Sequence, residues 1–310
     1  MLEAGVSSGL SLVNPGADDR DLVPYTEASV VCKGLRNRDF GSLSDPFAIL
    51  YELLPNGVYL ERDRTEVIFD DLNPNFCHKF SFEEQDKQKT FQMTIMDYDV
   101  VKKDDFLGNV RFTPQQLESA TDGVLELEIQ SKNGKISKKN GISTFYVERL
   151  MRSREPYKVG MELGLGADCK VESKKKIFLC LSRSTANSRD YVRIFRSEAM
   201  QIPSKKGESF VLPTFEVDSS TLTAQDPERH LLLELLLEGG RKGNHRNIGE
   251  VVFKVGKLDN LRAGESIAFF SGLSGDGRCR PQLVFPCMNW NVGRSTSVIV
   301  MRVSNLLIRW

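Results

Sequence analysis

The chain has 310 residues, which is enough for two domains of ordinary size, each able to bury its own core. Residues 1–155 hold 19 basic and 26 acidic residues and the rest hold 23 and 16, so net charges of −7 and +7 cancel in the whole chain. The six cysteines form no CxxC pair and no metal-site spacing with the three histidines, which excludes zinc ribbons and favours free thiols in a cytoplasmic protein. Neither a secretory signal nor a membrane-spanning apolar stretch is present, so we expect any membrane contact to be peripheral.

The first 24 residues are rich in Gly, Ser and Asp and show no hydrophobic periodicity, which predicts a disordered lead-in. Between residues 25 and 150, short runs of β-branched and aromatic residues alternate with turn residues. The eight runs are Ser29–Cys32, Phe47–Leu53, Arg64–Phe69, Cys77–Phe82, Phe91–Met96, Leu107–Phe112, Val124–Ile129 and Ile142–Val147. Runs at this spacing favour an antiparallel β-sandwich, and the Thr-Pro pair at Thr113 predicts a short helix over Thr113–Ser119.

Two of the connections between these runs are rich in carboxylates. The later one holds Asp97, Asp99 and Asp105, in a turn so short that each raises the cost of ionising the others unless a cation shares the site. The earlier one holds Asp39 and Asp45, with the same six-residue separation as Asp99 and Asp105. Two such loops, with backbone carbonyls and water, can supply the roughly six to eight oxygens in flexible geometry that Ca²⁺ takes, whereas Mg²⁺ needs a stricter octahedron. Ordinary turn formation by these acids is the alternative.

Five short segments occur in this half of the chain in a characteristic order. They are Asp39-x5-Asp45 with Pro46-Phe47, Arg64-Thr65-Glu66-Val67-Ile68, Leu72-Asn73-Pro74, Asp97-x-Asp99-x5-Asp105 with Phe106-Leu107-Gly108, and the run Lys135–Leu150. In this order and at this spacing they resemble a C2 domain, and more narrowly the first C2 domain of the copines. The resemblance implies an eight-stranded antiparallel sandwich over residues 25–150. It also implies a Ca²⁺ site at one tip, with Asp39, Asp45, Asp97, Asp99 and Asp105 as metal ligands.

After a linker at about residues 151–157 the pattern returns in a weaker form. The segments Asp168–Lys174, Arg196–Met200 and Leu232–Gly249 match Asp39–Asp45, Arg64–Ile68 and Phe91–Gly108 at shifts of 129, 132 and 141 residues. A shift that only grows is what insertions into one fold produce, and it predicts a second, degenerate C2-like domain over residues 158–310. The predicted fold class is therefore all-β, with two tandem eight-stranded antiparallel C2 β-sandwiches. Copines carry a von Willebrand factor type A domain after their C2 pair, and the sequence holds no counterpart of it.

In the second half, Lys174 replaces Asp45, Gly240 replaces Asp99 and Arg246 replaces Asp105 in the alignment. We expect no calcium there, because fixed positive charge lowers the affinity for a cation. The two loops would instead gather the basic residues Lys174, Lys175, Lys176, Arg241, Lys242, His245 and Arg246. They predict a calcium-independent contact with anionic phospholipid, and a solvated basic face is the alternative. Nucleic acid is not an expected partner, because no aromatic residues are interleaved with these charges.

In the first half, the calcium loops also carry residues suited to a membrane surface. The predicted membrane contacts are Phe40, Leu43, Val100, Val101, Lys102 and Lys103. Calcium would neutralise the acidic tip and let it meet an anionic phospholipid such as phosphatidylserine or a phosphoinositide, which makes the ion an electrostatic switch. Scattered exposed apolar residues are also normal on protein surfaces, which is the alternative for the apolar members of this set.

The predicted function is calcium-dependent phospholipid binding by a cytoplasmic protein that associates peripherally with the plasma membrane or other membranes. The alternative is a scaffold or adaptor that uses its C2 folds to bind other proteins. The sequence predicts no enzyme, because it contains no Ser-His-Asp arrangement, phosphate-binding loop or histidine metal cluster. A regulatory fragment of a lipid enzyme is less favoured, because no catalytic domain accompanies the pair.

Overall fold

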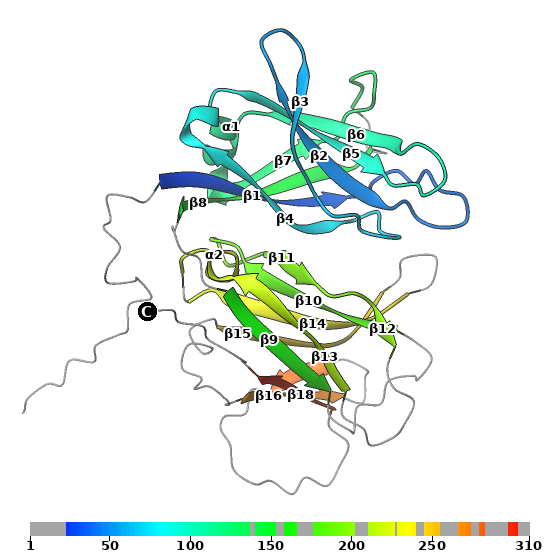
Figure 1. Cartoon of the computed structure of the whole chain (residues 1–310), viewed down its shortest axis with the longest axis vertical. Helices are drawn as coiled ribbons and strands as arrows, with labels where there is room; N and C mark the ends of the chain where they lie inside the picture. Colours follow the sequence, from blue (N-terminus) through cyan, green and yellow to red (C-terminus); the bar gives the residue numbers. More distant parts are fainter. Residues whose placement is uncertain are drawn as a thin grey trace, which may run out of the picture.

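The computed structural model is built mainly of antiparallel strands in two sandwiches, which lie one above the other along the long axis (Figure 1). It describes residues 23–136, 140–152, 158–165, 176–201, 210–226, 228–239, 245–254, 266–273, 279–282 and 297–302. The predicted lead-in over residues 1–24 lies outside these ranges except for its last two residues, which begin the first strand. Within the described ranges, no helix is long and apolar enough to cross a membrane.

The first sandwich consists of two four-stranded sheets, in the strand orders β4-β1-β8-β7 and β3-β2-β5-β6. Its strands are β1 Val23–Lys33, β2 Pro46–Leu53, β3 Tyr59–Arg64, β4 Asn75–Glu83, β5 Thr90–Asp97, β6 Asp105–Phe112, β7 Val124–Glu128 and β8 Ile142–Arg152. Short 3₁₀ turns occupy Glu84–Asp86 and Thr121–Gly123, and helix α1 spans Pro114–Glu118. Thr113 caps this helix by accepting a hydrogen bond from the Gln116 amide at 3.2 Å, as its Thr-Pro start predicts.

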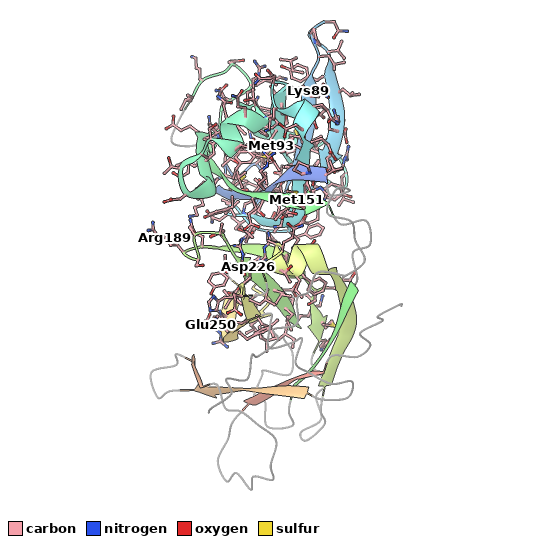
Figure 2. All side chains as sticks on the ribbon, turned by 90° about the vertical axis from the view of Figure 1, so that its left-hand side faces the viewer. Lys89, Met93, Met151, Arg189, Asp226 and Glu250 are labelled. Carbon is pink, nitrogen blue, oxygen red and sulfur yellow. The ribbon has the colours of Figure 1, made fainter. Side chains whose placement is uncertain are left out.

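The core of the first sandwich is filled by alternate side chains of facing strands. Four buried phenylalanines form a chain of ring contacts, with centroid distances of 5.0 Å between Phe82 and Phe91, 5.9 Å between Phe82 and Phe112, and 4.8 Å between Phe112 and Phe145. Figure 2 shows Met93 among the side chains inside this sandwich, where it is fully buried. This rigid core fixes the strand ends from which the loops of interest leave.

Seven of the eight predicted runs fall on strands of the first sandwich, but the third is wrong. The strand lies at Tyr59–Arg64 and not at Arg64–Phe69. It is an edge strand whose residues are almost all exposed, so no alternation of apolar and polar residues marks it in the sequence. Residues 65–74 instead form the connection to β4, and Ile68 is buried from within that connection.

The second sandwich also consists of two antiparallel sheets. One has the order β11-β10-β14-β15 with β12 beside β10, and the other has the order β13-β9-β18-β16-β17. The strands are β9 Lys158–Leu165, β10 Lys176–Ser184, β11 Tyr191–Arg196, β12 Met200–Gln201, β13 Phe210–Asp218, β14 His230–Leu237, β15 Arg246–Lys254, β16 Ser266–Leu273, β17 Cys279–Gln282 and β18 Ser297–Arg302, with helix α2 at Ser219–Thr223. The all-β prediction with two tandem sandwiches is confirmed, although the described ranges of the second hold ten strands where eight are predicted.

The sheet β4-β1-β8-β7 of the first sandwich faces β10 and β11 of the second (Figure 1). Ala28 and Val30 of β1 point into the core of their own sandwich. Glu27 and Ser29, which alternate with them and point to the other face, are buried too. In the same way β10 is buried at every position after Lys176. Both faces of these two strands are therefore covered, because each sandwich shields the outer face of the other.

Candidate functional site

Three connections of the first sandwich, residues 34–45, 65–74 and 98–104, form what we call the acidic tip, together with the strand ends beside them. The sheet register aligns acids at this end, because Pro46 pairs with Asp97 and Asp97 pairs with Asp105 across strands β2, β5 and β6. Asp45 directly precedes Pro46. Three of the five predicted metal ligands are thus placed side by side by strand pairing.

A series of hydrogen bonds from backbone amides to carboxylate oxygens joins the connections. The Asp45 amide donates to Oδ1 of Asp97 at 2.6 Å, and the Asp70 amide donates to Oδ1 of Asp45 at 2.7 Å. The Leu43 amide in turn donates to Oδ1 of Asp70 at 3.1 Å. Asp70 is an acid of this tip that sequence reasoning missed. Its signal is the Asp70-Asp71 pair, which directly follows the run Arg64–Phe69 that the sequence predicts as a strand.

Asp97 is the central carboxylate of the tip. The residue is only 2% exposed, and its Oδ2 has no hydrogen-bond partner among the described residues. Burial raises the pKa of Asp97. Hydrogen bonds with the Ser44 side chain and the Asp45 amide lower this pKa in part, and the nearby carboxylates of Asp39 and Asp105 raise it. Burial likewise raises the pKa of Asp45, with added repulsion from Asp70, Asp97 and Asp39. A buried, unpartnered carboxylate oxygen among crowded acids fits a hard cation, so the residues present are suited to Ca²⁺.

Lys102 lies between the two outer acids of the third connection. Its Nζ is 3.2 Å from Oδ2 of Asp99 and 2.8 Å from Oδ2 of Asp105, and these hydrogen bonds raise the pKa of the lysine. The other oxygen of Asp99 accepts hydrogen bonds from the Val101 and Lys102 amides at 2.9 and 3.0 Å, which lower the pKa of Asp99. Lys102 thus provides the positive charge that these two carboxylates share.

Asp39 lies in the first connection, where the Ser42 hydroxyl donates to its Oδ2 at 3.4 Å. The described residues include no group of three or more His, Cys, Asp or Glu side chains arranged to hold a metal ion. The acids lie at one tip, but Asp99 and Asp105 form ion pairs with Lys102. In this arrangement their carboxylates do not converge with the other acids on one ion position. A shared ion would therefore require these side chains to rotate and Lys102 to leave.

Replacing Lys102 with Gln is expected to tighten calcium binding by roughly two- to fivefold in the absence of lipid, since it removes a tethered cation that competes for Asp99 and Asp105. Calorimetric titration of calcium into the whole chain measures the change. Lys103→Gln removes the same charge one residue further along and is the matched control, for which we expect a smaller change. Equal affinities for the Lys102 and Lys103 variants would contradict a specific role for Lys102.

The predicted membrane contacts divide into two groups. Phe40, Val100 and Val101 project fully from the tip, at 106%, 82% and 94% exposure. Lys102 and Lys103 are exposed beside them. Leu43 differs, because it is half-buried and its amide is held by Asp70. The exposed apolar side chains therefore come from the first and third connections, on either side of the acids.

The predicted basic patch of the second sandwich is only partly within the described residues. Lys174, Lys175, Arg241 and Lys242 lie outside them. Lys176 and Arg246 are exposed at the starts of β10 and β15. His245 is half-buried, with its ring 4.9 Å from that of Phe178, and burial lowers its pKa. Its Nδ1 accepts a hydrogen bond from the Gly239 amide at 3.1 Å, so His245 serves here as an inward-packed acceptor and not as an exposed cation.

Most of the first sandwich is similar to a known family of domains. The family model described as "C2 domain" matches residues 27–129. Synaptotagmin-B of Diplobatis ommata is 37% identical over 95 residues, which are 28% of this chain and 21% of that protein. The match thus spans about a fifth of the length of this relative.

Two solved structures are also similar to parts of the chain. The structure described as BON1-C2B has a TM-score of 0.36 and 21% identity, covering 44% of this chain and 99% of that one. The calcium-bound pair of C2 domains of Extended-Synaptotagmin 2 has a TM-score of 0.31 and 12% identity, covering 90% and 95%. The family model and the match to the synaptotagmin agree that residues 27–129 of this chain are similar to C2 domains.

Proposed function

We propose that this chain is a calcium-dependent phospholipid-binding protein that is recruited to anionic membranes by its first C2 domain. The observation that supports this most is Asp97, whose buried Oδ2 has no partner among the described residues and lies amid acids that raise its pKa. Such a carboxylate is costly to keep ionised unless a cation shares the site. The proposal thus gives the acids a joint role that turn formation alone does not.

Asp39, Asp45, Asp97, Asp99 and Asp105 are the residues that would hold the ion. When bound, calcium supplies positive charge and free coordination positions for lipid phosphate or carboxylate oxygens. The acids repel an anionic surface in the absence of the ion. Once the ion has neutralised them, the exposed side chains of Phe40, Val100 and Val101 enter the headgroup region. Once released from Asp99 and Asp105, Lys102 joins Lys103 in contacting lipid phosphates.

The order of the motifs supports a copine-like arrangement, with a calcium-binding domain at residues 25–150 and a degenerate one at residues 158–310. The protein would associate peripherally with the cytoplasmic side of the plasma membrane or of other membranes. In the second domain, the basic residues around Lys176 and Arg246 would provide contact with anionic lipid that does not depend on calcium. A Lys174→Glu, Lys175→Glu, Lys176→Glu variant should lose binding to anionic vesicles in the absence of calcium.

Sedimentation of the whole chain with vesicles tests the function. We expect binding to phosphatidylserine-containing vesicles in calcium, and much weaker binding in chelator or with phosphatidylcholine alone. A Val100→Ser, Val101→Ser variant should lose roughly tenfold in vesicle affinity, because two apolar side chains no longer enter the membrane. Its calcium affinity without lipid should match that of the wild type.

Two results would contradict this proposal. Sedimentation with the vesicles to the same extent with and without calcium would show that calcium does not switch binding on. No sedimentation under any condition would favour the alternative of a protein-binding scaffold, in which Phe40, Val100 and Val101 contact another protein.

A further inference from the structure

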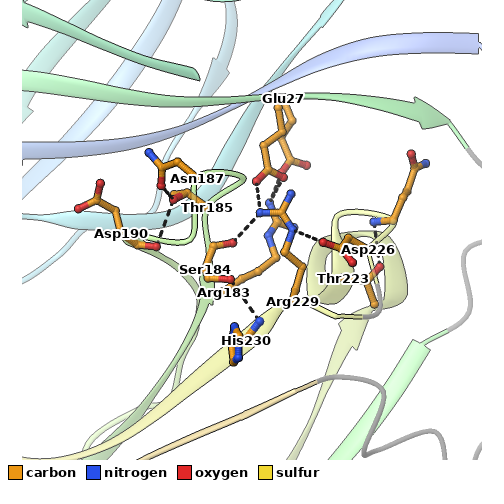
Figure 3. A network of polar contacts seen from close by, with 12 residues as sticks. Glu27, Arg183, Ser184, Thr185, Asn187, Asp190, Thr223, Asp226, Arg229 and His230 are labelled. Atoms are coloured by element: carbon orange, nitrogen blue, oxygen red, sulfur yellow. Dashed lines mark hydrogen bonds and ion pairs between the residues drawn. The ribbon is translucent and has the colours of Figure 1, made fainter. Parts of the chain in front are cut away.

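A cluster of four charged residues is buried where the two sandwiches meet (Figure 3). Arg183 of β10 is fully buried, and its Nη2 lies 3.0 Å from Oε1 of Glu27 and 2.9 Å from Oε2 of Glu148. Arg229 of the second sandwich lies 3.1 Å from the other oxygen of Glu148. We call Glu27, Glu148, Arg183 and Arg229 the boundary ion cluster. It sets two acids of the first sandwich against two arginines of the second.

The position of the acids shows what buries them. Glu27 and Glu148 are register partners on β1 and β8. Their neighbours Ala28 and Val147 face the core of the first sandwich, so the two glutamates face outward. In a separate first sandwich they would be ordinary exposed residues of a sheet. Charged side chains are rarely buried unless they are paired, so the facing arginines are what permits this burial.

Further contacts fix the boundary at other points. The Lys79 ammonium donates to the Arg193 carbonyl at 2.5 Å, and the Arg193 amide donates to Oδ1 of Asn75 at 3.1 Å. At the end of β8, the Met151 amide donates to Oε1 of Gln225 at 3.0 Å. Figure 2 shows Met151 where the first sandwich meets the second. Among the described residues, contacts on several different strands therefore hold the two sandwiches against each other.

The two sandwiches come close to each other beside the acidic tip. A hollow of about 800 Å³ between them is lined by Phe69 and Asp70, from the second connection of the acidic tip. Its opposite wall holds Glu238 and His245, from the ends of the β14–β15 connection. The two ends of the β14–β15 connection thus lie beside the acidic tip of the first sandwich.

We propose that the boundary ion cluster holds both sandwiches as one unit. This unit binds a single anionic bilayer with the acidic tip of the first sandwich and with the exposed Lys176 and Arg246 of the second. The unit does not bridge two membranes, because the proposed lipid contacts among the described residues of both sandwiches lie on one side of it. Binding through two linked contacts raises retention without further contacts, since the second contact forms within a complex that already exists. The claim of a single bilayer rests on the membrane function proposed above, whereas the claim of a single unit does not.

The test compares the whole wild-type chain with a Glu27→Lys, Glu148→Lys variant, which sets like charges against Arg183 and Arg229. Glu126→Lys, Glu128→Lys is the matched control, because these residues make the same charge change on the exposed neighbouring strand β7. Small-angle scattering measures the compactness of each protein. Light scattering measures whether each protein clusters phosphatidylserine vesicles in calcium, and sedimentation measures whether it binds them.

We expect the wild type and the control to scatter as one compact particle and to bind vesicles without clustering them. The Glu27→Lys, Glu148→Lys variant should show a larger radius of gyration and should cluster vesicles, because its released second sandwich can reach another bilayer. A wild-type profile typical of two loosely linked bodies overturns the single unit, and this result does not depend on whether the variant folds. An unchanged profile for the variant also overturns the role of the cluster.

Vesicle clustering by the wild type overturns the claim of a single bilayer. Failure of every protein to sediment with vesicles overturns the proposed membrane function and that claim together. The scattering comparison still decides whether the cluster holds the sandwiches as one unit.

Discussion

An Asp45→Asn, Asp97→Asn double variant is expected to lose calcium binding, with an affinity roughly a hundredfold or more below that of the wild type. These two residues are at the centre of the acidic tip, joined by the 2.6 Å hydrogen bond from the Asp45 amide to Asp97. Their loss removes two negative charges and two oxygen ligands of a site whose affinity depends on both. Calorimetric titration of calcium into the whole chain measures the loss.

The design of this variant separates lost ligands from lost structure. Asn keeps the Oδ1 acceptors for the Asp45 and Asp70 amides. Because burial raises the pKa of Asp45 and Asp97, their ionised forms oppose folding at neutral pH, and a neutral amide relieves this. The variant should therefore unfold at the same or a higher temperature without calcium. An Asp63→Asn, Asp122→Asn control lies outside the tip and should bind calcium as the wild type does. Equal titration curves for all three proteins would show that these acids are not calcium ligands.

A Phe145→Ala variant is expected to lose about 3–5 kcal/mol of unfolding free energy, the usual result of emptying a buried aromatic site. Phe145 is fully buried on β8, with its ring 4.8 Å from that of Phe112. The same strand carries Glu148 of the boundary ion cluster, so damage here affects both the core and the boundary. Urea denaturation followed by fluorescence measures the change.

Phe40→Ala is the matched control, because it makes the same substitution at a residue that is wholly exposed. We expect it to change the unfolding free energy by less than about 0.5 kcal/mol. It should weaken vesicle binding, however, because Phe40 is a proposed membrane contact. A similar loss of stability in both variants would contradict the core that the structure describes.

The local sequence pattern was sufficient to predict most strands of the first sandwich. The alternation of Phe91, Met93 and Ile95 with more polar neighbours predicts β5, because side chains of a strand point alternately to either face. The same reasoning fails for β3, which lies at an edge and is exposed on both faces, so neither face selects apolar residues. It also missed Asp70, whose place in the tip depends on its backbone turn, with a φ of 53°, and on its hydrogen bond to Asp45.

The all-β class, the acid-bearing connections and the difference in charge between the halves can all be predicted from the sequence, because each depends on residues close together along the chain. The packing of the connections was needed to show that Asp70 is a neighbour of Asp45, since the two are joined by a hydrogen bond between separate connections. The tertiary structure alone revealed Arg183, which meets Glu27 across 156 positions of sequence. No local pattern predicts such a pair, because the burial that makes it necessary exists only once the two sandwiches have packed.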